Sequence, residues 1–94
     1  MKNKRSTQSI DFYVGDRLRQ VRMAAGLSQA DLAKAADITY QQIQKYEQGG
    51  NRISTGRLYN FARIFDVPLD YFVDGFESSQ KRYKKKTNKQ LMDN

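Results

Sequence analysis

Hydrophobic residues recur every three or four positions along most of this chain, which is the spacing of an α-helix with one buried face. The pattern predicts five helices, over residues 11–25, 29–36, 40–48, 55–65 and 69–73. The fourth of them has a strong apolar stripe, formed by Leu58, Phe61, Ala62 and Phe65. The chain is therefore expected to be all-α.

Residues that start or end helices separate these stripes. Ser28 with Asp31, and Thr39 with Gln42, have the spacing of a capping box, in which a hydroxyl accepts from a free backbone N–H and the later side chain reaches back. Gly26 is the residue type expected at the left-handed end of the first helix. Only a turn fits between the second and third helices, so these two helices are predicted to form a helix-turn-helix.

The third predicted helix has two unlike faces when its residues are placed about 100° apart. Ile43, Tyr46 and Glu47 share one side, which is expected to face the core. The other side is made of Gln41, Gln44, Lys45 and Gln48, with Tyr40 and Gln42 at its margins. Gln can pair with adenine and Lys can reach guanine, so this face favours contact with DNA bases. A solvated glutamine-rich face is the alternative, but such faces normally carry both charge signs.

Several motifs occur in the register of one known family: Gly26-Leu27-Ser28-Gln29, Leu32-Ala33, Ile43, Tyr46-Glu47 and Gly49. With them the chain resembles the Cro/repressor-type (XRE-like) helix-turn-helix family over residues 14–72. The resemblance implies a compact five-helix, lambda-repressor-like domain that binds double-stranded DNA as a dimer, with its third helix in the major groove. Ala36, Asp37 and the absence of Pro from residues 49–53 depart from the family pattern and bear on turn geometry more than on function.

The helix face and the resemblance together assign roles to individual residues. Base edges are expected to be read by Thr39, Tyr40, Gln41, Gln44 and Lys45. The DNA backbone is expected to be contacted by Gln29, Gln42, Asn51 and Arg52. The resemblance also implies a structural ion pair between Arg22 and Glu47. So small a domain is not expected to bury all of its C-terminal apolar side chains, and the expected dimer contact is an apolar patch of Tyr71, Val73 and Phe76.

The distribution of charge divides the chain into three parts. The net charge is +7, but the positive excess lies in residues 1–10 and 80–94, and the sequence between them is nearly neutral. Residues 1–10 are expected to be a flexible basic arm, residues 11–76 the DNA-binding domain, and residues 77–94 a basic, disordered tail. The lysine cluster of that tail is expected to be solvated or to touch phosphates without reading sequence.

The composition excludes several classes of protein. The chain contains no cysteine and no histidine, which excludes disulfides, zinc fingers and most transition-metal sites. The usual nucleophiles and general bases of enzymes are missing for the same reason, so the chain is not expected to be an enzyme. No cofactor and no small-molecule effector are expected. A signal peptide or membrane span would need a longer apolar run, and a cytoplasmic protein is expected.

The predicted function is therefore sequence-specific regulation of transcription. A repressor is expected, acting as a homodimer on a palindromic operator with the helix of residues 40–48 in the major groove. The alternative is an antitoxin or coactivator-type protein-interaction module on the same fold. The apolar C-terminal end and the basic tail would then be its working parts, and a face without carboxylates on the third helix would serve no purpose.

Overall fold

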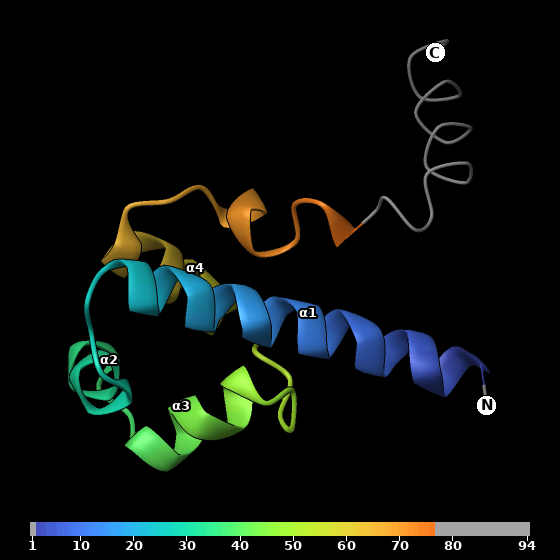
Figure 1. The fold of residues 1–94 in the computed structure, drawn as a ribbon, viewed down its shortest axis with the longest axis horizontal. Coiled ribbons are helices and arrows are strands. Elements are labelled where there is room, and N and C mark those ends of the chain that lie inside the picture. Colours follow the sequence, from blue (N-terminus) through green and yellow to red (C-terminus); the bar gives the residue numbers. More distant parts are fainter. Residues whose placement is uncertain (1, 77–94) are drawn as a thin grey trace, which may run out of the picture.

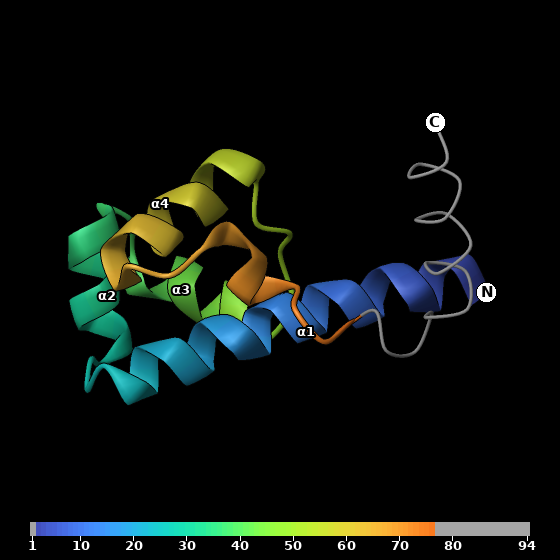
Figure 2. The same ribbon diagram turned by 90° about the horizontal axis from the view of Figure 1, so that it is seen from above.

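The computed structural model describes residues 2–76, which form four α-helices and one 3-10 helix (Figure 1). The elements are α1 (Lys2–Ala24), α2 (Gln29–Ala36), α3 (Tyr40–Glu47), α4 (Thr55–Phe65) and η1 (Leu69–Phe72). The shorter helices pack around the C-terminal half of α1, and the N-terminal end of α1 extends beyond them (Figures 1 and 2). None of the helices in this part of the chain combines the length and the apolar character needed to cross a membrane.

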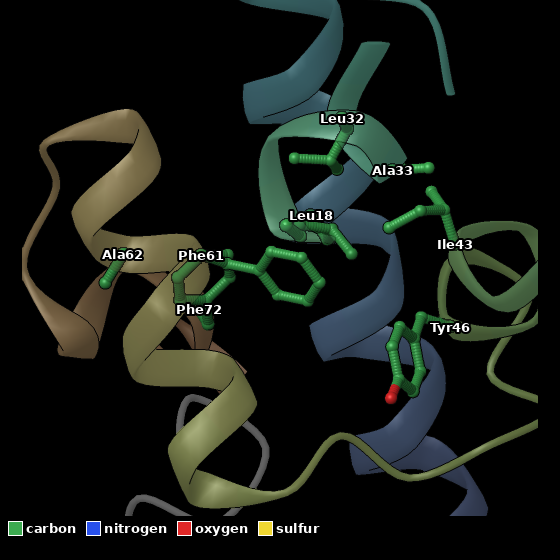
Figure 3. Close-up of a cluster of buried hydrophobic side chains, with 9 residues drawn as sticks. Leu18, Leu32, Ala33, Ile43, Tyr46, Phe61, Ala62 and Phe72 are labelled. Carbon is green, nitrogen blue, oxygen red and sulfur yellow. The ribbon is translucent and has the colours of Figure 1, made fainter. Parts of the chain in front are cut away.

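The core lies where all four α-helices and η1 meet (Figure 3). Its largest fully buried side chains come from every element: Leu18, Leu32, Ile43, Phe61 and Phe72. Burying a side chain of this size contributes roughly 1.5–3 kcal/mol, so these five supply much of the hydrophobic stabilisation. Phe61 lies on the apolar stripe predicted for the fourth helix and Ile43 on the predicted core face of the third, and the all-α class is confirmed.

Polar side chains close the helix junctions. The Ser28 hydroxyl accepts from the N–H of Asp31 (2.9 Å), and the Asp31 carboxylate accepts from the N–H of Ser28 (3.0 Å), so this capping box is complete. The Thr39 hydroxyl accepts from the N–H of Gln42 (3.2 Å). The Gln42 amide instead donates to the hydroxyl of Tyr46 (3.3 Å), so the second box is only half formed.

The N-terminal part of the chain differs from the expectation. α1 begins at Lys2 rather than at Asp11, so residues 2–10 are helical where a flexible arm was predicted. This segment contains neither glycine nor proline, and its Lys, Arg and Gln are good helix formers. Because adding a turn to an existing helix is far easier than nucleating one, α1 propagates outward from the core.

The C-terminal part also differs from the predicted five-helix arrangement. The fifth element is a single 3-10 turn that buries Phe72 and leaves Leu69 38% exposed. Pro68 precedes it and Gly75 follows with a φ of +93°, so the space between these residues is too short for an α-helix. The predicted basic tail, residues 77–94, lies outside the described residues.

Candidate nucleic-acid interface

α2 and α3 form the helix-turn-helix pair, joined by residues 37–39. Asp37 takes the left-handed conformation (φ 60°), and its N–H donates to carbonyls of the last turn of α2. Ile38 packs against the core, and Thr39 caps α3. These three residues reverse the chain and fix the start of α3 relative to α2.

α3 presents two faces, as its sequence predicted. Ile43, Tyr46 and Glu47 are buried. The exposed side chains are the five predicted base readers and Gln48, namely Thr39, Tyr40, Gln41, Gln44, Lys45 and Gln48. The outer face therefore carries amides, hydroxyls and one ammonium group, all of which are able to contact base edges or phosphates.

The only carboxylate of α3 is turned away from this face. The side chain of Glu47 is 3% exposed and that of Arg22 is 11% exposed. Glu47 accepts two hydrogen bonds from Arg22, from Nε at 2.6 Å and from Nη2 at 3.0 Å. Arg22 also donates from Nη1 to the carbonyl of Leu27 (2.8 Å). The ion pair that the resemblance implied is thus present, and Lys45 carries the only charge that α3 exposes.

The predicted backbone-contacting residues fall into two groups. Gln29 is half-buried, and its amide nitrogen donates to Glu47 (3.0 Å), which ties α2 to the pair between α1 and α3. Gln42 is also half-buried and bonded to Tyr46. Asn51 and Arg52 are exposed in the loop after α3. The side-chain amide of Gln29 and that of Gln42 each have a second N–H hydrogen that can donate to a phosphate.

The N-terminus of α2 already holds a negative charge. The backbone N–H and hydroxyl of Ser28 bond to Asp31 and hold the pKa of its carboxyl below the ordinary value of 3.8, so Asp31 is ionised at neutral pH. This carboxylate complements the positive end of the helix dipole. A phosphate at this end of α2 would therefore depend on the Gln29 side chain more than on the dipole.

The sequence profile of the helix-turn-helix family matches residues 18–72, which span the core, α2, α3 and α4. The chain belongs to this family. It is 44% identical over 85 residues to an uncharacterised helix-turn-helix-type transcriptional regulator of Rickettsia prowazekii. The aligned region covers 90% of this chain and 65% of the relative. It is 46% identical over 79 residues to an uncharacterised transcriptional regulator in the ATPase CF(0) region of Rhodospirillum rubrum, covering 84% and 73%. The chain thus spans about two thirds of the length of these relatives.

Solved structures agree with this assignment. The restriction-modification controller protein C.AhdI from Aeromonas hydrophila superposes with a TM-score of 0.65 at 26% identity, covering 69% of this chain and 94% of that one. The clp gene regulator ClgR from Corynebacterium glutamicum shares the fold, with a TM-score of 0.67 at 17% identity over 88% and 89% of the two chains. This XRE-like helix-turn-helix protein is a DNA-binding transcriptional regulator.

The predicted dimer residues of this regulator lie against its own α1. The Arg17 guanidinium stacks 3.9 Å from the ring centroid of Tyr71, and the two residues exchange hydrogen bonds through their backbone carbonyls (2.9 and 3.3 Å). The Tyr13 ring packs 5.4 Å from that of Phe76, and its hydroxyl donates to the carbonyl of Asp74. Tyr71, Val73 and Phe76 are all half-buried. α1 therefore packs against Tyr71 and Phe76 and partly covers the expected patch, and a dimer contact through these residues stays a prediction.

Two residues that position the interface were missed from the sequence. A Cβ on Gly15 would lie 2.2 Å from the carbonyl oxygen of Tyr46, so the backbones of α1 and α3 touch there. The sequence feature that could have indicated this contact is a glycine inside a helix, three positions before Leu18 on the buried face. Arg57 donates to the carbonyl of Ala36 at the end of α2 (3.1 Å), and nothing in the sequence indicated this contact.

Proposed function

We propose that this regulator is a sequence-specific repressor that binds double-stranded DNA with α3 in the major groove. Base edges are read by Gln41, Gln44 and Lys45, with Thr39 and Tyr40 at the start of the helix. The DNA backbone is contacted by Gln29, Gln42, Asn51 and Arg52. Repression is the expected outcome because a protein in the groove excludes other proteins from the same stretch of DNA.

The composition of the exposed face of α3 is the observation that carries this proposal. Three exposed glutamines and a lysine offer hydrogen-bond donors that reach adenine and guanine edges. The one carboxylate of the helix, Glu47, is buried and held by Arg22 and Gln29. A face turned toward phosphates gains from this arrangement, because an exposed carboxylate there would repel the DNA backbone.

We propose further that the regulator acts as a homodimer on a palindromic operator. α3 has only eight residues and reaches few base pairs. Two copies related by a two-fold axis double the sequence that is read, with their recognition helices about 34 Å apart in successive major grooves. Tyr71, Val73 and Phe76 are half-buried, and α1 packs against Tyr71 and Phe76, so a dimer contact at this end of the domain would use only part of each side chain.

The test begins with selection of bound sequences from random duplex DNA. Gln41→Ala and Lys45→Ala are then compared with the wild type on the selected duplex and on a scrambled duplex. Each base contact is worth roughly 1–3 kcal/mol of discrimination, so each variant should lose about five- to 150-fold on the operator and much less on the scrambled DNA. Arg19→Ala is the control for charge, because Arg19 is an exposed cation on α1.

Four results would contradict the proposal. A selection that returns no enriched sequence would show that binding is not sequence-specific. Equal losses on both duplexes would mean that Gln41 and Lys45 touch only phosphates. If the protein–operator complex sediments with one chain per duplex, the protein does not bind as a dimer. If the selected sequence lacks two-fold symmetry, the operator is not palindromic.

A further inference from the structure

The loop between α3 and α4 lies against the middle of α1 (Figures 1 and 2). Two consecutive residues of α1 hold it. The Asp11 carboxylate accepts a hydrogen bond from Nε of Arg52 at 3.3 Å. The Phe12 ring fills the space beside Gly49, where an added Cβ would lie 2.3 Å from a ring carbon. Asp11 and Phe12 thus hold the loop at Arg52 and at Gly49.

The geometry of Arg52 leaves its outer edge available. Its side chain is 71% exposed, whereas that of Asp11 is 21% exposed. The bond to Asp11 uses Nε, the nitrogen nearest the aliphatic stem. No hydrogen bond of the two terminal nitrogens occurs within the described residues, so Nη1 and Nη2 are free to form the paired contact that guanidinium makes with phosphate.

Asp11 has two opposed consequences for DNA binding, one electrostatic and one entropic. Its negative charge lies close to a proposed phosphate contact and repels the DNA backbone. Its hydrogen bond restricts Arg52, a long side chain that otherwise loses rotamer freedom when DNA binds. The cost of immobilising such a side chain corresponds to roughly a two- to tenfold change in affinity. Because the Asp11 carboxylate bonds to Nε, the positive charge of Arg52 lies between it and a phosphate on the terminal nitrogens and offsets the repulsion, so the restriction is the larger effect.

We infer that Asp11 is a positioning residue for DNA binding. With Phe12, it holds the loop after the recognition helix and presents the outer edge of Arg52 to a phosphate. This inference rests on the proposed function, and specifically on the backbone contact of Arg52. It gives the middle of α1 a role in the interface, although α1 lies outside the helix-turn-helix itself.

The test is a double-mutant cycle in the full chain, with Asp11→Asn, Arg52→Gln and the double variant on the selected operator at physiological salt. Asp11→Asn should weaken binding about two- to tenfold even though it removes a negative charge. In the Arg52→Gln background the same substitution should have no effect or should tighten binding slightly. Asp16→Asn is the matched control, because it removes the same charge from an exposed position of α1 that contacts Arg19 and Gln20.

Nuclear magnetic resonance provides a second measurement that needs no DNA. The Arg52 Nε–H group should show restricted motion in the wild type and faster motion in Asp11→Asn, with unchanged circular dichroism. The inference is overturned if Asp11→Asn binds as well as or better than the wild type, or if its loss persists without Arg52. Absence of operator binding by the wild type would instead overturn the proposed function, and the inference with it.

Discussion

Replacing Glu47 with glutamine tests whether the buried pair organises the interface. Glu47→Gln keeps the shape of the side chain but removes its charge and one of its two accepting oxygens. In the structure Oε2 accepts from Nε of Arg22, and Oε1 accepts from Nη2 of Arg22 and from Gln29. An amide at this position places an NH2 group against at least one of these donors. It also leaves the Arg22 guanidinium without a counter-charge.

The magnitude follows from the burial of the pair. Breaking one partner of a buried ion pair costs roughly 3–5 kcal/mol. Arg22 is 11% exposed and keeps its bond to the Leu27 carbonyl, so the lower end applies. A loss of about 3 kcal/mol is a large part of the 5–15 kcal/mol typical of a domain. For a domain of this size it lowers Tm by roughly 12–24 °C.

The assay is thermal and urea unfolding followed by circular dichroism, with operator binding measured well below Tm. Asp16→Asn is the control, because its contact with Arg19 spans 4.0 Å between two half-exposed side chains and is worth about 0.5 kcal/mol or less. The double variant Arg22→Met with Glu47→Leu should recover much of the loss, since it leaves no unpaired charge. A loss below about 1 kcal/mol in Glu47→Gln, or no recovery in the double variant, would refute the reasoning.

Glycines and the turn between α2 and α3 supply further predictions. Gly15→Ala should destabilise the domain by roughly 1–3 kcal/mol because its methyl group meets a backbone oxygen of α3 at 2.2 Å. Gly56 lies on open helix surface, so Gly56→Ala should stabilise the domain by about 0.5–1 kcal/mol. If urea unfolding gives Gly15→Ala and Gly56→Ala the same change in stability, the close contact at Gly15 is contradicted. Asp37→Gly should raise Tm by several degrees, since Asp37 has a φ of 60° and its left-handed conformation costs roughly 1 kcal/mol in a non-glycine residue. An unchanged or lower Tm would show that the carboxylate has a compensating role in the turn.

Local signals in the sequence determined much of the fold. The predicted bounds of α2 and α4 agree with the structure, and α3 ends one residue earlier than expected. The reason is that caps and helical periodicity act over three or four residues, a distance within which the chain specifies its own conformation. Ser28, Thr39 and Ser54 each accept a hydrogen bond from the first turn of their helix. The division of α3 into a buried and an exposed face followed from the same periodicity.

Tertiary structure decided which polar and aromatic groups meet across large sequence separations. The contact between Gln29 and Glu47, the bond between Arg52 and Asp11, and the cover that α1 provides for Tyr71 depend on how helices pack. Hydrophobic periodicity shows only one buried face of a helix. It therefore predicts neither the N-terminal extension of α1 nor the partial burial of Tyr71 against a second face of α1. Arg17 lies on a second face of α1, and its contact with Tyr71 arises only when the C-terminal segment packs there.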